Sequence, residues 1–156
     1  MVEIAFYHLT RRSPEQALPV LLERSLARGW RVVVQAMSEQ GLKRLDELLW
    51  SYRPESFLPH GKKSDGEPQS QPIYLTLDGD NPNAADARFF LEGARIAPVL
   101  ALSAAAPRER AVLIFDDGER DAARAQWKEL LASGARLTYW QENEDGKFEK
   151  KLEKNA

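Results

Sequence analysis

Residues 30–36, W-R-V-V-V-Q-A, are the stretch that says most about the fold. A continuous β-branched run such as residues 32–34 is typical of an inner strand that is covered on both faces. Gly29 stands directly before it, where glycine commonly ends a helix in a left-handed conformation. The stretch therefore predicts a helix that ends at Gly29 and is followed at once by a central strand.

The residues before this stretch predict the first strand and the first helix. Residues 2–9 are apolar and β-rich, and we expect a strand there. Residues 13–16, S-P-E-Q, resemble a capping box, but Pro19 would interrupt an interior helical turn. We therefore expect the helix to begin near Ala17. A strand, a helix and a strand with short connections form a right-handed crossover by default.

The rest of the chain continues the alternation of strands and helices. Helices are expected from Ser38 to about Trp50 and over residues 119–133. The polar, Gly-, Pro- and Ser-rich residues 60–72 predict a loop. Residues 93–109 receive no single assignment, because they contain prolines that argue against one long helix. The remaining strands are expected at 72–77, 87–92, 111–115 and 137–141.

This alternation predicts an α/β fold, a single three-layer domain with a mostly parallel sheet and helices on both faces. The domain is expected to span residues 1–141, since two domains in 156 residues would each bury too little surface. Residues 142–156 are rich in charge and poor in apolar side chains. We therefore expect them to form a disordered tail.

Composition excludes several classes of protein. The chain has 24 acidic and 22 basic residues and a net charge of −2, so the molecule as a whole does not attract DNA phosphates, although a local basic face is possible. It has no cysteine, which excludes disulfides, thiolate metal sites and cysteine nucleophiles. No apolar run reaches the roughly 18 to 20 residues of a membrane span, and no signal-peptide pattern opens the chain. We expect a cytoplasmic protein.

Nucleotide-binding α/β folds carry glycines directly after the first strand. Here residues 8–13 read H-L-T-R-R-S, and neither a G-x-G-x-x-G nor a G-x-x-x-x-G-K-[ST] motif occurs. The sheet is therefore expected to be Rossmann-like but without the nucleotide-binding glycine loop. Because no convincing acid–base set accompanies it, we expect a non-catalytic protein without a cofactor or a metal.

Asp116 and Asp117 support an alternative, since they follow a predicted strand at the edge where α/β folds place their chemistry. Paired carboxylates there could hold Mg²⁺ or accept a phosphoryl group, as in response-regulator receivers. That pattern also requires an acid after the first strand and a lysine after a later one, and neither is identifiable. The simpler interpretation is that Asp117 and Glu119 favour the N-terminus of the next helix.

One face of the predicted helix 119–133 carries a basic and aromatic set. Arg120, Arg124, Trp127 and Lys128 stand at i, i+4, i+7 and i+8 and therefore share a face. Cations beside an indole suit a carboxylate that neighbours an apolar side chain. The alternative is a solvated charged face with Trp127 turned inward, and helical geometry alone favours that alternative.

A second cluster lies in residues 45–60, L-D-E-L-L-W-S-Y-R-P-E-S-F-L-P-H. Trp50, Phe57 and Leu58 stand around two prolines just beyond a predicted helix end. Such a cluster either caps the core or forms an exposed anchor for a partner protein. The pattern alone leaves both interpretations open.

The blocks at residues 45–50, L-D-E-L-L-W, and 54–60, P-E-S-F-L-P-H, resemble the signature of the chi subunit family of bacterial DNA polymerase III. The resemblance extends over residues 1–141 and is weakest between residues 61 and 110. It is also carried by Phe6-Tyr7, residues 29–32 (G-W-R-V), residues 123–128 (A-R-A-Q-W-K), Gly134 and Tyr139-Trp140.

The resemblance implies an adaptor of the replisome. Chi subunits bind the acidic C-terminal tail of single-stranded DNA-binding protein, which ends in a phenylalanine with a free carboxylate. Through the psi subunit they attach to the clamp loader, so we expect a monomer within hetero-complexes that meets DNA only indirectly. The implied tail-binding residues are Arg120, Arg124, Trp127, Lys128 and Leu113. The implied surface for psi, or for another replisome protein, consists of Trp50, Phe57 and Leu58.

Overall fold

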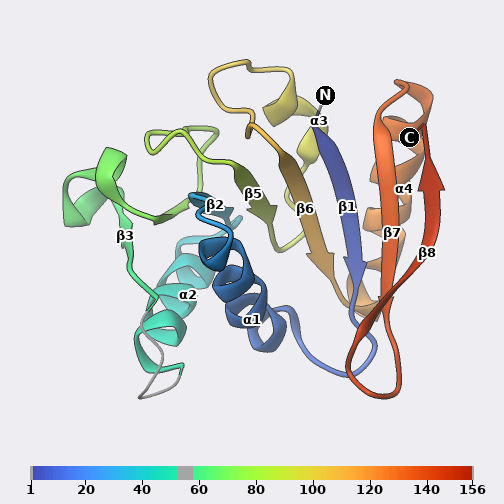
Figure 1. The fold of residues 1–156 in the computed structure, drawn as a ribbon, viewed down its shortest axis with the longest axis horizontal. Helices are drawn as coiled ribbons and strands as arrows, with labels where there is room; N and C mark the ends of the chain where they lie inside the picture. Colours follow the sequence, from blue (N-terminus) through green and yellow to red (C-terminus); the bar gives the residue numbers. More distant parts are fainter. Residues whose placement is uncertain (1, 53–57, 156) are drawn as a thin grey trace.

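A computed structural model describes residues 2–52 and 58–155. These residues form one eight-stranded sheet in the order β3-β4-β2-β5-β6-β1-β7-β8 (Figure 1). Neighbouring strands are parallel except for the antiparallel pair of β7 and β8, so the predicted mostly parallel sheet is confirmed. The strands are β1 (Glu3–His8), β2 (Val32–Gln35), β3 (His60–Lys62), β4 (Ile73–Thr76), β5 (Ala87–Phe90), β6 (Arg110–Phe115), β7 (Arg136–Glu142) and β8 (Phe148–Lys154).

Helices pack on both faces of the sheet and give the expected three layers. In Figure 1, α1 and α2 lie on the near side, and α4 lies on the far side behind β7. The helices are α1 (Pro14–Ala27), α2 (Glu39–Ser51), the short α3 (Ile96–Leu100) and α4 (Arg120–Ala132), with 3-10 turns η1 (Lys63–Asp65), η2 (Pro68–Ser70) and η3 (Asp117–Glu119). Within the described ranges, no helix is long and apolar enough to cross a membrane.

Alternation along the inner strands divides the core into two halves. In β1, Ala5 packs with the leucines of α1 and α2, whereas Ile4 and Phe6 pack with the apolar residues of α3 and α4. This follows from the two-residue period of a strand, which sends successive side chains to opposite faces. The run at residues 32–34 is fully buried, as its composition predicts for a central strand.

The expectation that the first helix begins near Ala17 is wrong, because α1 begins at Pro14. Ser13 accepts a hydrogen bond from the backbone N–H of Gln16, and the Gln16 side chain accepts one from the Ser13 N–H, so the capping box is complete. Pro19 lies inside the helix. A proline so close to the start removes one backbone hydrogen bond, and the capping box fixes the turn before it.

The loop expected over residues 60–72 also contains more structure than predicted. The strand β3 begins at His60, and η1 and η2 follow it before β4. This edge strand is only three residues long and pairs with one neighbour, so it leaves little pattern in the sequence.

The disordered tail expected over residues 142–156 is also a wrong prediction, because residues 148–154 form β8. Its lysines and glutamates are those of an exposed edge strand, for which charge prevents unwanted pairing. Between Tyr139 and Trp140 the register shifts, so Tyr139 faces Leu152 and Trp140 faces Lys150. This bulge sends Leu152 to the α4 side of the sheet, where it meets Tyr139, while Phe148 packs on the α1 side.

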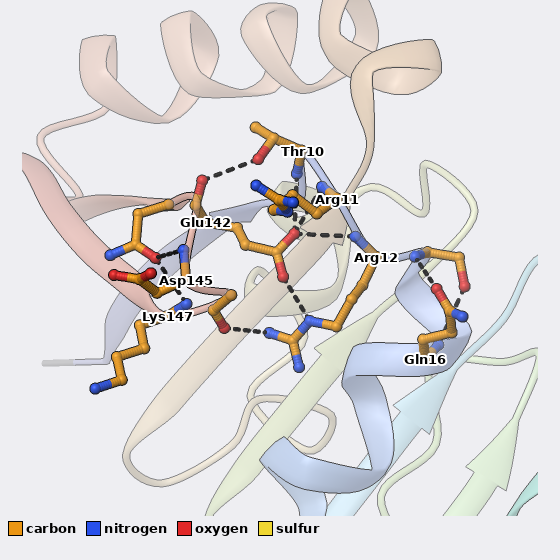
Figure 2. Close-up of polar contacts among 10 residues, drawn as sticks. Thr10, Arg11, Arg12, Gln16, Glu142, Asp145 and Lys147 are labelled. Carbon is orange, nitrogen blue, oxygen red and sulfur yellow. Dashed lines mark hydrogen bonds and ion pairs between the residues drawn. The ribbon is translucent and has the colours of Figure 1, made fainter.

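The hairpin of β7 and β8 is attached to the β1–α1 loop by the buried carboxylate of Glu142, which is 2% exposed. Its Oε1 accepts the backbone N–H groups of Thr10, Arg11 and Arg12 at 3.2, 2.8 and 3.0 Å (Figure 2). Its Oε2 accepts Arg12 Nε at 2.5 Å, and Arg12 Nη2 donates to the Gly146 carbonyl at 3.0 Å. Desolvation raises the pKa of Glu142, but the hydrogen bonds and the charge of Arg12 prevail and lower it.

Candidate functional site

A pocket of about 190 Å³ lies where α4 packs on the sheet, and we call it the α4 pocket. Strands β1, β6, β7 and β8 each give it one side chain, and α4 gives it the remaining four. The lining residues are Phe6, Phe115, Arg120, Ala123, Arg124, Trp127, Tyr139 and Leu152. The pocket therefore combines two arginines with a mostly aromatic interior.

The interior of the α4 pocket is built on ring contacts of Trp127. Its indole meets Phe6 edge-on, with ring centroids 5.2 Å apart, and Tyr139 edge-on at 6.0 Å. Edge-to-face contacts of this kind fix ring orientation. Trp127 is half-buried against the α4-side core and still lines the pocket. Trp127 is therefore turned inward and still presents part of its ring to the pocket.

The rim of the pocket carries the exposed side chains of Arg120 and Arg124. Neither forms an ion pair with any residue that the structure describes. The pKa of the neighbouring Tyr139 hydroxyl is raised, chiefly by burial and also by the charge of Asp117. The positive charges of Arg120 and Arg124 oppose this shift. The rim therefore presents two guanidinium groups that are free to receive an anion.

His8 contacts two of the residues that line the pocket, Tyr139 and Phe115. Its Nδ1 lies 2.5 Å from the Tyr139 hydroxyl, its Nε2 lies 2.6 Å from Asp117 Oδ1, and its ring stacks on Phe115 at 4.9 Å. His8 and Phe115 end the adjacent strands β1 and β6, Asp117 follows β6, and Tyr139 lies in the middle of β7 on the other side of β1. The network holds two pocket-lining rings in place.

The Asp116–Asp117 pair is thereby occupied in local contacts. Asp116 accepts the backbone N–H of Gly118 at 3.0 Å and caps η3, which directly precedes α4. Asp117 binds His8. Over the described residues, no group of three or more carboxylate or imidazole side chains could hold a metal ion. Asp117 and Glu119, the acids expected to favour the helix start, lie in η3 directly before α4. The side-chain cap of η3 is Asp116, however, and Glu119 at the N-cap of α4 forms no cap hydrogen bond.

Sequence spacing identified only part of the α4 pocket. Arg120, Arg124 and Trp127 come together as expected, but Lys128 is exposed and outside the lining. Leu113 is 1% exposed and belongs to the core beneath α4. The lining residues that spacing missed are Phe6, Phe115, Tyr139 and Leu152. They come from β1, from β6 and from the β7–β8 hairpin, which are far apart in sequence, so only the order of strands in the sheet could reveal them.

The second predicted surface is organised around His60. Its Nε2 lies 3.0 Å from Asp46 Oδ1, and its Nδ1 lies 2.7 Å from the Leu58 carbonyl. The ring of Trp50 lies 4.8 Å from the imidazole, and this tryptophan is 65% exposed. The family-signature blocks thus meet in space, with Asp46 of the first bound to His60 of the second. We call this group the Trp50 surface.

The three residues expected at this surface have different outcomes. Trp50 is at the surface, and Phe57 lies outside the described residues. Leu58 is 3% exposed and packs in the α1-side core, so it supports the surface from within.

The open sheet, the basic pocket on one face and the exposed tryptophan on α2 together define a small α/β domain with two candidate binding surfaces. A family model described as DNA polymerase III chi subunit, HolC, matches residues 1–138, and the chain belongs to that family. The resemblance seen in the sequence is confirmed. Members of the family are non-catalytic accessory subunits, which decides against the phosphoryl-transfer alternative for Asp116 and Asp117.

One relative is "Probable DNA polymerase III subunit chi" from Rickettsia prowazekii (strain Madrid E). The two sequences are 30% identical over 100 residues. The alignment covers 64% of this chain and 61% of the relative's length.

Proposed function

We propose that this chain is a cytoplasmic adaptor of DNA replication, and that the α4 pocket binds the acidic C-terminal tail of single-stranded DNA-binding protein. The observation that carries the proposal is the pair of unpaired arginines at the rim of an aromatic pocket, in a chain of the chi family. The tail offers the complementary groups, a terminal phenylalanine ring and its free carboxylate.

The size of the pocket supports a single anchoring side chain. Its volume of about 190 Å³ is below the roughly 300–1,000 Å³ of sites for drug-sized ligands. The phenylalanine ring would lie against Trp127 and Tyr139, and Arg120 or Arg124 would bind the carboxylate through two parallel hydrogen bonds. A short peptide buries little surface, so we expect micromolar affinity, about −8 kcal/mol.

The test is a titration with a fluorescent tail peptide, alongside the same peptide without its last residue. Removing the terminal phenylalanine is expected to weaken binding at least about tenfold, since it removes the ring and displaces the carboxylate. Arg28→Ala is the matched control, because this exposed arginine follows α1 on the opposite side of the sheet. Equal binding of the two peptides, or binding of neither, contradicts the proposal.

We further propose that the Trp50 surface links the chain to the clamp loader, through a psi subunit or another replisome protein. The support is an exposed tryptophan held against the buried His60, the kind of residue that dominates protein interfaces. Trp50→Ala is expected to weaken the complex by about 2 kcal/mol or more.

Surface plasmon resonance with purified clamp-loader subunits measures this effect. The control is Leu102→Ala, another exposed apolar side chain, which is expected to leave the complex unchanged. An unchanged complex with Trp50→Ala would place the link elsewhere on the chain.

A further inference from the structure

A second, larger hollow lies on the opposite side of the sheet from the α4 pocket. Its volume is about 710 Å³, and we call it the α1 groove. One wall is α1, which contributes Arg24, and the floor is formed by Val112 of β6 and Tyr7 of β1. Trp140 of β7 and Phe148 of β8 complete it. In the view of Figure 1, no described helix lies in front of β1, β7 and β8, so this part of the sheet remains open.

The charge of the α1 groove differs from that of the whole molecule. Arg12, Arg24, Arg28, Arg110 and Lys147 line it, and no aspartate or glutamate is among the described lining residues. The net charge of the chain is −2, so this concentration of cations is local. It is a basic face of the kind that overall composition leaves possible.

Several of these cations are free to bind an anion. Arg12 is engaged by Glu142, and Arg110 Nε lies 3.8 Å from Glu3 Oε1. Arg24, Arg28 and Lys147, by contrast, form no ion pair with the residues that the structure describes. All three are exposed.

Aromatic rings lie among these cations. The ring of Tyr7 lies 5.8 Å from that of Trp140 and 4.7 Å from that of Phe148, all three half-buried on the open part of the sheet. At the other end, the guanidinium groups of Arg28 and Arg110 lie 4.8 and 5.6 Å from the Trp30 ring. Cationic groups beside accessible rings are what unpaired nucleobases and their phosphates require.

The length of the groove favours a polymer over a single small anion. Arg12 precedes α1 and Arg28 follows it, and the 14 residues of α1 span roughly 20 Å at 1.5 Å per residue. A single phosphate group cannot reach both ends. A base-paired duplex could meet the cations, but its stacked bases could not lie on Tyr7 or Trp140.

We propose that the α1 groove binds single-stranded nucleic acid, with phosphates on Arg24 and Arg28 and bases stacked on Tyr7 and Trp140. This goes beyond the adaptor role, in which DNA is reached only through a partner. Because the groove and the α4 pocket lie on opposite sides of the sheet, one chain could hold a protein tail and a nucleic-acid strand together.

The experiment measures fluorescence anisotropy of a labelled oligothymidylate of roughly 16 nucleotides, the upper end of single-domain site sizes. Three freed cations predict a slope of about −2 for log affinity against log salt concentration, at about −0.7 per phosphate contact on a single strand. A duplex of equal length should bind about tenfold more weakly, because it cannot stack its bases on the aromatic rings.

The decisive variant is Arg24→Ala with Arg28→Ala, and the matched control is Arg120→Ala with Arg124→Ala. The first pair is expected to weaken oligonucleotide binding about tenfold and to flatten the salt slope by about 1.4. The control pair is expected to leave oligonucleotide binding intact. Arg24→Gln with Arg28→Gln repeats the test with longer side chains, and thermal unfolding of every variant confirms that each is folded.

Four outcomes would overturn the inference. The first is absence of oligonucleotide binding by the unmodified chain at low salt, and the second is equal binding of single strand and duplex. The third is full binding by the Arg24/Arg28 variants. The fourth is displacement of the oligonucleotide by an acidic peptide of the same charge at equal concentration, which would make the groove a protein-binding site instead. Binding of the tail peptide, measured on the same samples, reports on the α4 pocket separately.

Discussion

The α4 pocket and the α1 groove use the same kinds of side chain in different shapes. Each combines arginines with aromatic rings, but the pocket measures about 190 Å³ and the groove about 710 Å³. The pocket places its two arginines beside one apolar hollow, whereas the groove distributes its cations over α1 and its two ends, over β6 and over the β7–β8 turn. The small pocket therefore suits one terminal residue, whereas the long groove suits a polymer with a series of negative charges.

The two sites nevertheless share a structural support, the hairpin of β7 and β8. The bulge after Tyr139 lets β8 contribute Leu152 to the α4 pocket and Phe148 to the α1 groove. Glu142 attaches this hairpin to the β1–α1 loop. Changes at Glu142 should therefore affect both sites, and changes at a rim arginine should affect one.

Glu142→Ala is expected to have the largest effect. It removes a buried carboxylate that accepts three backbone N–H groups and pairs with Arg12, so the free energy of unfolding should fall by about 3–5 kcal/mol. Chemical denaturation measures the loss, and both the tail peptide and the oligonucleotide should bind more weakly. Glu144→Ala, an exposed change in the same hairpin, should stay within about 0.5 kcal/mol of the unmodified chain.

The same carboxylate predicts the direction of a pH effect. The pKa of Glu142 is lowered in the folded chain from its ordinary 4.5, so its contribution to stability is present above that value. It is lost as the pH falls through the lowered pKa. The stability difference between the unmodified chain and Glu142→Gln should therefore shrink between neutral pH and about pH 3. A difference that stays constant would show that the negative charge is not what stabilises the hairpin.

Arg124→Ala should weaken binding of the tail peptide by about 1.5 to 3 kcal/mol, because it removes charged hydrogen bonds to the carboxylate. It should leave oligonucleotide binding unchanged, which separates the two faces of the sheet. Arg124→Lys should restore only part of the affinity, since an ammonium group cannot form the two parallel bonds. Titration calorimetry measures all three. A negligible loss with Arg124→Ala would assign the carboxylate to another residue.

The sequence predicted the parts of this fold that depend on local pattern. The β-branched run at residues 32–34 identified the central strand, and the spacing of Arg120, Arg124 and Trp127 identified one face of α4. It failed at β8, because an edge strand rich in lysine and glutamate has the composition of a disordered tail.

The rest of the α4 pocket depends on which strands are neighbours. Phe6, Phe115 and Tyr139 are brought together because β6, β1 and β7 are adjacent in the sheet. No spacing in the sequence encodes that order. Leu58 also could not be placed from the sequence. It is buried in the core with residues of α1 and α2, and its aromatic neighbours in sequence do not reveal this.

Leu152→Ala tests whether β8 takes part in the α4 pocket. This side chain is 47% exposed, so a bound ring would bury the rest of it, and its removal should weaken the tail peptide by about 1 kcal/mol. Oligonucleotide binding should not change. The matched control is Leu131→Ala, an exposed leucine of α4 that does not line the pocket. If the two substitutions had equal effects, β8 would take no part in binding the tail peptide.

Lys128→Ala should have the smallest effect. Lys128 stands one turn beyond Arg124 but outside the pocket lining, so it can attract only the acidic residues that precede the phenylalanine of the tail. An exposed charge of this kind is worth about 0.2–1 kcal/mol, and salt screens it over roughly 8 Å at physiological ionic strength. A peptide titration at two salt concentrations measures the effect, which should disappear at the higher one. A loss as large as that of Arg124→Ala would mean that the tail continues along α4. In that event both faces of the sheet would bind extended anions. The α4 pocket would then differ from the α1 groove only in that it also anchors one terminal residue.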